Sequence, residues 1–446
     1  MTTTKNNEHK KLNFSSEREQ SQACLNSAEH EKNHGRKVLN VPNLRFPEFQ
    51  GEWEMCKVSD LLDFYSTNSL SWDKLEYGTD AIQNLHYGLI HVGLPTMVNL
   101  SKDKLPNIVS GNTPKNYVLC QEGDIAFADA SEDTNEVAKA IEFYNLNGKD
   151  VICGLHTIHG RDNQQKTVVG YKGYAFSSTA FHHQIRRIAQ GTKIYSINSK
   201  NFSECHIGIP SKEEQKKIAT LLRLIDERIA TQNKIIEDLK ELKAAIIEKV
   251  FNGKHSEKLQ LNDVGSYIRG LTYSSNDIVE HGGTLVMRSN NIINGSLIDY
   301  NNNVVFVNKQ MSAEQQLQNG DVVICMANGS SSLVGKSSFY DGSCHSPITV
   351  GAFCGIYRSK EPIVKWLFQT NKYRRYIWNS LQGGNGAIAN LNGEDILNMS
   401  FSIPNAPIKD TCVKMLASVD SALENNMSLC ALYTLQKQHL LRQMFI

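Results

Sequence analysis

Residues 211–251 read SKEEQKKIATLLRLIDERIATQNKIIEDLKELKAAIIEKVF and decide the fold. Ser211 stands where a helix N-cap is expected, and Glu214 follows three residues later, as in a capping box. The stretch contains neither Pro nor Gly until Gly253, so it predicts one continuous helix from Ser211 to Phe251. At 1.5 Å per residue, such a helix is about 60 Å long, which is more than a single globular core requires.

Apolar residues recur in this stretch at alternating steps of four and three. This is the seven-residue repeat with which one helix keeps a seam against another, and only Gln232 and Lys243 interrupt it. After Pro404 the C-terminus repeats the pattern at a constant offset of 194, so that Leu416 corresponds to Leu222. Two copies of one long helix, each behind a block of about 160 residues, indicate an internal duplication. The predicted seam consists of Ile218, Leu222, Ile225, Ile229, Ile236, Leu239 and Ile246 in the first copy and Leu416, Val419, Leu423, Leu440 and Met444 in the second.

The two blocks in front of the helices share anchor motifs but differ in most other residues. The Gly123-Asp124 turn of the first block recurs as Gly320-Asp321 in the second, each followed by a β-like run. The sequence therefore predicts an α+β protein with two duplicated modules of mixed α/β structure and short strands, separated by two long antiparallel helices that form a coiled-coil spacer. The predicted boundaries are a flexible N-terminal extension at 1–40, a first module at 41–210, a first long helix at 211–253, a second module at 254–404 and a second long helix at 405–446.

Composition limits the class of protein. The chain has 446 residues and a formal net charge of +1, which argues against a uniformly basic, nonspecific binder of anions but permits a local basic face. Its ten Cys are scattered singly, and the N-terminus lacks an apolar signal segment, so we expect a reduced, cytoplasmic chain whose thiols pack as small hydrophobic groups. No apolar run approaches the 18 residues that a membrane span requires.

Positive charge gathers in the second half of each module. Residues 151–203 contain seven Lys and Arg against one acidic residue, and residues 330–392 contain seven against two. A solvated face explains a single cluster, but its recurrence in both copies favours an anionic partner such as duplex DNA. The predicted DNA-binding residues are Arg161, Lys166, Lys172, Arg186, Arg187 and Lys193 in the first module and Arg288, Asn290, Lys336, Arg374, Arg375 and Asn385 in the second.

Motifs that would indicate catalysis do not fit. Gly335-Lys336-Ser337 resembles the end of a P-loop, but the spacing from Gly329 is wrong for wrapping a phosphate. His182-His183 and His345 lack neighbours at metal-ligand spacing, so we predict no metal site. The sequence also lacks the Asn-Pro-Pro-Tyr or Asp-Pro-Pro-Tyr stretch of adenine methyltransferases and a convincing nuclease cluster. We therefore expect no catalytic residues in this chain.

Taken together, the duplicated modules and helices resemble the specificity subunit of type I restriction-modification systems. The resemblance covers residues 41–446, and each mark is weak by itself. The marks are the helix start Pro210 to Ala219, Leu44-Arg45-Phe46-Pro47 with Trp53, the two Gly-Asp turns, Gly191-Thr192-Lys193, Gly384-Asn385-Gly386-Ala387, and Ile225-Asp226 with its counterpart Val419-Asp420.

The resemblance implies a non-catalytic, sequence-specific DNA-binding subunit. In that family each module is a target recognition domain for one half of a split double-stranded DNA site, and the helices fix the gap between half-sites and dock two methyltransferase subunits. S-adenosylmethionine, ATP and Mg²⁺ then belong to the methyltransferase and restriction subunits, with no cofactor in this chain. The second helix departs from the pattern, because it begins Pro404-Asn405-Ala406-Pro407-Ile408-Lys409 without the Glu-Gln pair.

Other functions remain open at this stage. One is a self-contained restriction or methylation enzyme, which requires a methyltransferase motif or metal-binding carboxylates in this chain. Another is a protein-binding scaffold that does not contact DNA. For the long helices alone, the structural alternative is a coiled coil that joins copies of the same chain.

Overall fold

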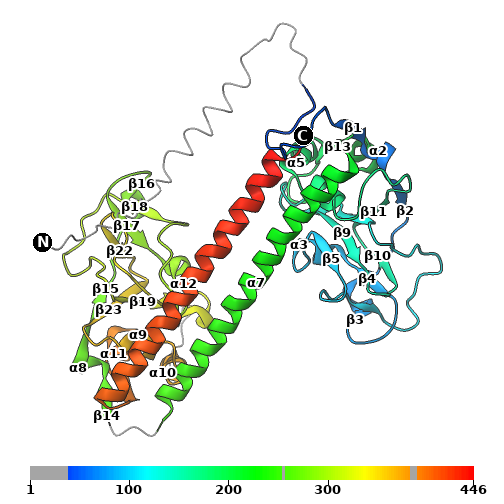
Figure 1. The fold of residues 1–446 in the computed structure, drawn as a ribbon. Coiled ribbons are helices and arrows are strands. Elements are labelled where there is room, and N and C mark those ends of the chain that lie inside the picture. Colours follow the sequence, from blue (N-terminus) through cyan, green and yellow to red (C-terminus); the bar gives the residue numbers. More distant parts are fainter. Residues whose placement is uncertain (1–38, 254–256, 382–388) are drawn as a thin grey trace, which may run out of the picture. The chain divides into compact units, whose positions relative to one another are not determined.

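The computed structural model describes residues 39–253, 257–381 and 389–446, and the chain divides into two compact units. Within the described residues, unit 1 consists of 39–223 and 438–446, and unit 2 consists of 224–437 without the gaps. The first module belongs to unit 1 and the second to unit 2. Each combines short strands with short helices, which confirms the predicted α+β class (Figure 1).

Unit 1 is built on two sheets, of order β2-β11-β7-β9-β5 and β10-β4-β6-β3, and on two strand pairs, β1-β13 and β12-β8. Its strands are β1 (Glu54–Lys57), β2 (Asp63–Tyr65), β3 (Leu75–Glu76), β4 (Gln83–Leu85), β5 (Met97–Asn99), β6 (Asn107–Ile108), β7 (Ile125–Ala128), β8 (Ala130–Ser131), β9 (Ala140–Asn145), β10 (Val151–Cys153), β11 (Thr157–Arg161), β12 (Tyr195–Ser196) and β13 (His206–Ile209). Its short helices are α2 (Val58–Leu61), η1 (Trp72–Lys74), α3 (Tyr87–His91), α4 (Lys172–Phe176), α5 (Thr179–Ile188) and α6 (Ser199–Ser203).

Unit 2 has sheets of order β15-β23-β19-β21 and β16-β18-β17-β22, and the pairs β14-β25 and β20-β24. Its strands are β14 (Glu257–Gln260), β15 (Gly265–Arg269), β16 (Ile278–Val279), β17 (Thr284–Met287), β18 (Val305–Val307), β19 (Val322–Cys325), β20 (Ala327–Asn328), β21 (Ser337–Phe339), β22 (Ile348–Val350), β23 (Cys354–Ser359), β24 (Ala389–Asn390) and β25 (Ser400–Ile403). Its short helices are α8 (Leu261–Val264), η2 (Ser275–Asp277), η3 (Ser289–Asn291), η4 (Ser331–Leu333), α9 (Val364–Leu367), α10 (Asn371–Leu381) and α11 (Gly393–Leu397).

The two modules have the same topology. The order β2-β11-β7-β9 matches β15-β23-β19-β21, and β10-β4-β6-β3 matches β22-β17-β18-β16. The one parallel pair of the second sheet is also shared, because β10 pairs with β4 as β22 pairs with β17. Strand β5, parallel to β9, is an additional edge strand of the first module. The two main sheets therefore have the same strand order in both modules, although the sequences differ.

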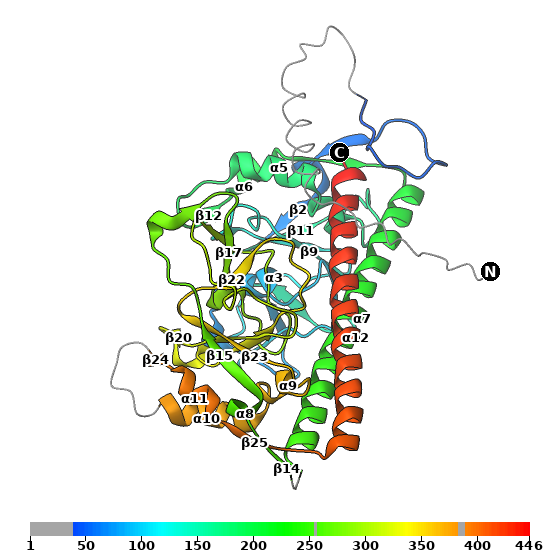
Figure 2. The same cartoon turned by 90° about the vertical axis from the view of Figure 1, so that its left-hand side faces the viewer.

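Two long helices, α7 (Lys212–Phe251) and α12 (Ala406–Gln443), complete the chain. Their portions within unit 2 lie side by side and antiparallel (Figures 1 and 2). Lys243 Nζ lies 2.7 Å from Asp420 Oδ1, and Lys437 Nζ lies 2.6 Å from Asp226 Oδ1. At the offset of 194, Lys437 corresponds to Lys243 and Asp420 to Asp226, so these ion pairs are two copies of one contact.

The centre of this helix pair is polar. Gln232 donates a hydrogen bond to Asn426, which is its own counterpart at the same offset. A local two-fold axis of the duplicated helices therefore passes between these two side chains. The two residues that interrupt the apolar seam in the sequence, Gln232 and Lys243, are thus partnered across the helix pair.

The C-terminal end of α12 and the N-terminal turns of α7 belong to unit 1. Phe445 packs edge-on against Trp53 at 6.4 Å between ring centroids, and lies 5.9 Å from the ring of Tyr171. Ile218 and Leu222 of α7 are buried. In the described parts of the chain, no helix is both long and apolar enough to cross a membrane.

Candidate functional site

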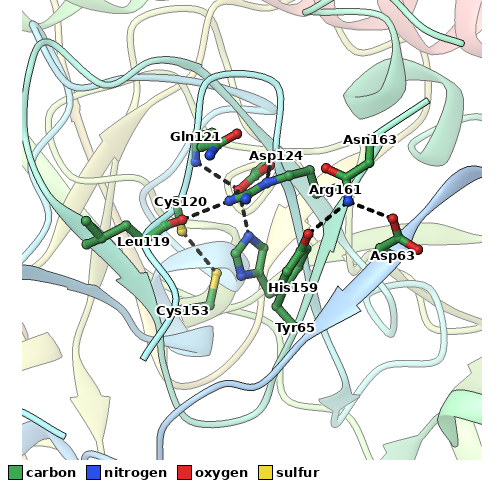
Figure 3. A network of polar contacts seen from close by, with 10 residues as sticks. All are labelled: Asp63, Tyr65, Leu119, Cys120, Gln121, Asp124, Cys153, His159, Arg161 and Asn163. Carbon is green, nitrogen blue, oxygen red and sulfur yellow. Dashed lines mark hydrogen bonds and ion pairs between the residues drawn. The ribbon is translucent and has the colours of Figure 1, made fainter. Parts of the chain in front are cut away.

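Each module holds a buried carboxylate at its Gly-Asp turn. In the first module, Arg161 of β11 donates to Asp124 from Nε and Nη2, both at 2.7 Å, and Nη2 also donates to the carbonyl of Leu119 at 2.8 Å. Burial alone would raise the pKa of Asp124, but hydrogen bonds from Arg161 and His159 outweigh it and lower the pKa. Arg161 also lies over the ring of Tyr65 at 4.8 Å. Figure 3 shows this network.

The second module repeats the arrangement. Arg358 of β23 donates to Asp321 from Nε at 2.8 Å and from Nη2 at 2.7 Å, and Nη2 donates to the carbonyl of Gln316 at 2.7 Å. Asp and Arg are 37 residues apart in both copies, a sequence signal that could have identified the pair. The charge pattern of the sequence predicts that Arg161 binds DNA. Its contact with Asp124 instead gives it an internal role within the first module.

Next to the Asp124 carboxylate, the first module gathers three side chains that can ligate a metal. His159 Nε2 lies 2.7 Å from Asp124 Oδ2, and the Sγ atoms of Cys120 and Cys153 are 3.6 Å apart. One ligand atom from each of Cys120, Cys153 and His159 falls within 4.8 Å of the others, and all three residues are buried. The sequence does not reveal this group, because its members come from three separate segments at no recognisable spacing.

Two of the predicted DNA-binding lysines have partners inside unit 1. Lys172 is 2% exposed and contacts the buried Glu142 carboxylate at 3.3 Å and the Thr167 hydroxyl at 3.0 Å. Lys166 Nζ lies 3.7 Å from Cys56 Sγ. The structure therefore gives Lys172 a role in the core, away from the surface that a DNA phosphate could reach.

Helix α5 presents the most basic surface among the described helices of the first module. Ser178 caps it by accepting from the amide of Phe181 at 3.2 Å, and Phe181 and Ile185 are buried beneath it. This anchoring leaves Arg186 and Arg187 exposed. Arg186 is oriented by His183 Nδ1 at 2.9 Å and Asn135 Oδ1 at 3.1 Å. Lys193, a few residues beyond α5, is also exposed.

Helix α10 is the equivalent element of the second module. Thr370 accepts from the amide of Tyr373 at its start, and Tyr373 and Ile377 are buried at the positions that Phe181 and Ile185 occupy in α5. Arg374, Arg375 and Trp378 are exposed. The two helices therefore share an anchor but carry different side chains on the outer face.

A hollow beside α10 brings two predicted residues together. Lys336 and Arg374 both line it, with Asn294, Ser332 and the 64% exposed Trp378. A cationic rim with an exposed aromatic ring and amide or hydroxyl groups can contact phosphates and base edges. Asn385 falls outside the described residues.

Arg288 and Asn290 lie at the short helix η3, where Asn290 is exposed. Arg288 Nη2 donates to the carbonyl of Asn303 at 3.1 Å, and Ser289 accepts from Asn328 at 3.4 Å. The assignment of the exposed basic and amide residues to DNA stays a prediction for both modules.

The start of α7 has an internal role that the sequence analysis did not foresee. Ser211 accepts from the amide of Glu214 at 3.3 Å, but the Glu214 carboxylate is held by Arg45 at 2.7 and 2.8 Å. Gln215 accepts from the amide of Val168 at 2.9 Å and donates to the carbonyl of Pro210 at 2.9 Å. The Glu-Gln pair therefore locks the first module to its helix. Its counterpart at the start of α12 is different, since Lys409 there contacts Glu361 at 3.1 Å.

All predicted seam residues of the long helices are buried or half-buried. A second set of apolar side chains on the same helices is exposed. It consists of Leu224, Ile235 and Leu242 on α7 and Ile408, Met415, Met427, Leu429, Leu432 and Leu435 on α12. Exposed apolar side chains that gather in this way mark surfaces that pack against a partner.

Comparison with known proteins finds relatives for part of the sequence and for the fold. Residues 103–241 match the family model described as type I restriction modification DNA specificity domain. The type I restriction enzyme EcoKI specificity subunit of Escherichia coli (strain K12) is 34% identical over 158 residues, which cover 33% of this chain and 31% of that protein. The StySPI specificity subunit of Salmonella potsdam is 32% identical over 178 residues, 36% of each chain. The matched region thus spans about a third of these two relatives.

The fold also matches a solved structure over nearly its whole length. The S subunit of a type I restriction-modification system from M. genitalium superimposes with a TM-score of 0.57 and 15% identity, covering 91% of this chain and 99% of the other. At this identity the match concerns the fold alone. The strand order, the paired long helices and the sequence matches agree with the resemblance found from the sequence: residues 103–241 are similar to the type I restriction modification DNA specificity domain, and the chain shares the fold of a type I restriction-modification S subunit.

Proposed function

We propose that this chain is the DNA-reading subunit of a type I restriction-modification complex. Each module binds one half of a bipartite site in double-stranded DNA, and the two half-sites differ in sequence. The observation that carries the proposal is the pair of equivalent helices α5 and α10, which share buried anchors and each expose two arginines, but differ in the other side chains of the outer face.

The chemistry of the two outer faces supports different DNA targets. Arg186 and Arg187 on α5 are guanidinium groups beside His183, whereas α10 combines Arg374 and Arg375 with an exposed Trp378. Phosphate contacts supply affinity, and Arg or amide side chains discriminate bases through their edges. Equivalent elements with unlike outer residues suit modules that have one task but different sequences to recognise.

The long helices serve two further purposes in this proposal. Their seam and ion pairs keep them antiparallel, so that they act as a spacer of fixed length between half-sites. Joining two readers by a rigid spacer raises the effective concentration of the second on DNA once the first is bound. The exposed apolar side chains of α7 and α12 are proposed to dock two methyltransferase subunits.

Catalysis is assigned to partner subunits. Methylation with S-adenosylmethionine then belongs to the methyltransferase subunits, and ATP- and Mg²⁺-dependent cleavage to the restriction subunits. Incubating the purified chain alone with DNA, Mg²⁺ and S-adenosylmethionine should give neither methylated nor cleaved DNA. Methylation or cleavage of DNA by the chain alone, once a contaminating enzyme is excluded, would instead support a self-contained enzyme.

Methylome sequencing of cells that express the chain with its methyltransferase subunit tests the central claim. We expect methylation at a bipartite motif with two unlike half-sites and a constant gap. Exchanging the outer residues of α10 for alanine should relax one half of the motif and leave the other unchanged. A contiguous motif, or methylation that does not depend on this chain, would reject the proposal.

The spacer is tested by lengthening both helices together. One additional heptad beside Gln232 and another beside Asn426 preserve the phase of the seam and lengthen the rod by about 10 Å. At about 3.4 Å per base pair, the recognised gap should grow by about three base pairs. A control variant replaces the same two heptads without changing their number. An unchanged gap in the longer protein would show that the helices do not set the spacing.

A further inference from the structure

The group formed by Cys120, Cys153 and His159 lies in the core of the first module and takes no part in the proposed DNA contacts. Cys120 precedes the Gly-Asp turn, Cys153 ends β10, and His159 lies in β11. Their exposed fractions are 5%, 2% and 0%. Three separate segments therefore bring a soft-donor set together in the interior, where polar groups are costly unless they have partners.

One atom of this group lacks a partner. His159 Nε2 faces Asp124 Oδ2 at 2.7 Å, whereas Nδ1 is buried and makes no hydrogen bond among the described residues. In Figure 3, the ring nitrogen that is not bonded to Asp124 faces the sulfur of Cys153. A carboxylate on one imidazole nitrogen and a free second nitrogen is the arrangement by which proteins orient a metal-binding histidine.

The distance between the two sulfur atoms excludes a disulfide and allows a shared ion. Cys120 Sγ and Cys153 Sγ are 3.6 Å apart, within the range of a thiol–thiol hydrogen bond. A disulfide requires about 2.05 Å, whereas two thiolates at about 2.3 Å from one tetrahedral zinc ion lie about 3.8 Å from each other. The sulfur pair is therefore already close to the separation that a shared ion requires.

The second module supplies a comparison for the same positions. The amide of Cys120 donates to Val151 as that of Leu317 donates to Ile348, which aligns Cys120 with Leu317 and Cys153 with Val350. The strand pairings His159 with Ala126 and Ile356 with Val323 align His159 with Ile356.

Leu317, Val350 and Ile356 pack in one apolar cluster, beside the same Asp–Arg pair that both modules share. The first module thus replaces all three apolar residues of this site by Cys, Cys and His, while the surrounding frame stays the same. The apolar trio of the second module shows that this site can be filled without metal-binding side chains. Packing therefore does not explain why the first module has Cys, Cys and His here.

We propose that Cys120, Cys153 and His159 bind one Zn²⁺ ion, through the two sulfur atoms and His159 Nδ1. Both thiols lose their protons on binding, so two thiolates, a neutral imidazole and the divalent ion sum to zero charge. The Asp124 carboxylate is balanced separately by Arg161. Three protein ligands leave the fourth position of the tetrahedral ion to a water molecule. The ion would join the segment before β7, β10 and β11 in the first module alone. This departs from the sequence-based expectation that the chain binds no metal.

The primary test measures metal on the full-length chain purified without chelators and with a reductant that does not bind zinc. Elemental analysis should find about one equivalent of zinc per chain. After zinc removal, titration with Co²⁺ should produce thiolate-to-cobalt charge-transfer absorption and the visible bands of a tetrahedral ion. The absence of both zinc and the cobalt spectrum in the wild-type chain would overturn the proposal.

The second module suggests the variants. Cys120→Leu, Cys153→Val and His159→Ile together install the apolar trio, and this variant should fold but lose its zinc. Cys325→Ala is the matched control, since it copies Ala128 at the equivalent buried position of the first module and should leave the zinc content unchanged. Chelator should lower the melting temperature of wild type and leave that of the triple variant unchanged.

Two further outcomes would also overturn the assignment. Zinc retained by the triple variant would place the ion elsewhere, and a Cys120–Cys153 disulfide in non-reducing peptide maps of freshly isolated protein would make the pair a redox couple. If the triple variant does not fold, Cys153→Ser decides the matter in its place. This variant should lose part of the cobalt charge-transfer intensity, and an unchanged spectrum would exclude Cys153 as a ligand.

Discussion

The two modules of this chain share a frame and differ in what the frame carries. Both have the same order of strands in both main sheets and the same buried Asp–Arg pair at a Gly-Asp turn. They differ on the outer face of one helix, α5 against α10, and at a core site that is Cys, Cys and His in one module and apolar in the other. The contacts that define the topology are thus the same in both modules, whereas positions that do not define it differ.

The difference also shows how charge should be interpreted in such a protein. A count of basic residues treats Arg161, Lys172 and Arg186 alike. In the structure, Arg161 and Lys172 neutralise buried carboxylates, whereas Arg186 is exposed on α5. The positive charge that remains available to a partner is therefore concentrated on fewer elements than the sequence suggests.

The largest expected effect comes from breaking the shared Asp–Arg pair. Arg161→Ala and Arg358→Ala each leave a carboxylate that is at most 2% exposed without its ion partner. Loss of one partner of a buried pair costs about 3–5 kcal/mol. Urea unfolding should show a destabilisation of this size for either variant, while the exposed Lys360→Ala should change stability by less than about 0.5 kcal/mol. If Arg161→Ala kept full stability but lost DNA affinity, Arg161 would be a DNA contact after all.

The helix pair offers the next test. Asp420 contacts Lys243 at 2.7 Å, Lys365 at 3.2 Å and the indole nitrogen of Trp366 at 3.0 Å. Asp420→Ala leaves Lys243, 8% exposed, without its carboxylate, and should destabilise unit 2 by about 3 kcal/mol or more in thermal unfolding. Adding Lys243→Met should recover part of this loss, since it removes the more deeply buried of the two lysines that lose their carboxylate. A double variant as unstable as the single one would contradict this account.

DNA binding should respond to the outer face of α5 more than to charge alone. Arg186→Ala with Arg187→Ala should weaken DNA binding by the reconstituted complex and reduce the slope of log affinity against log salt by about two, one for each phosphate contact. The matched control is Lys102→Ala with Lys104→Ala, which removes the same charge from exposed positions in the first half of the module. Equal effects of the two pairs would indicate a general electrostatic attraction without a defined contact.

The smallest expected effect concerns pH and His86, whose side chain caps α3 in the first module. His86 Nδ1 accepts from the amide of Gly88 at 3.2 Å, and Arg288 occupies the equivalent position at η3. Burial, with a contribution from His156, lowers the pKa of His86 below 6.5. The unfolded chain therefore binds this proton more readily, and stability should fall as pH drops from 6.5 through the folded-state pKa.

The control for this effect is His86→Asn, which keeps a cap acceptor but does not titrate. Between pH 7 and 5, the wild-type chain should lose more stability than this variant in urea unfolding, by about 1 kcal/mol or less. A difference of opposite sign would mean that protonated His86 gains a partner in the folded state.

The sequence by itself determined the duplication, the two long helices and the α+β class. The seven-residue apolar repeat and the constant offset between the two helices can both be read from residue positions, without knowing which segments touch. The recurring Gly-Asp motif located the two turns, and the count of basic residues included the Arg pairs of α5 and α10. For this reason the resemblance to type I specificity subunits is present in the sequence itself.

Only the tertiary structure decided which charges are internal and which donors meet. Arg161 reaches Asp124 across 37 residues, and Cys120, Cys153 and His159 converge from three separate segments. The Glu-Gln pair of α7 likewise binds Arg45 and the loop at Val168, contacts that no helical pattern contains. Such contacts depend on which distant segments pack together, whereas the apolar pattern of a segment indicates only which of its own faces is buried.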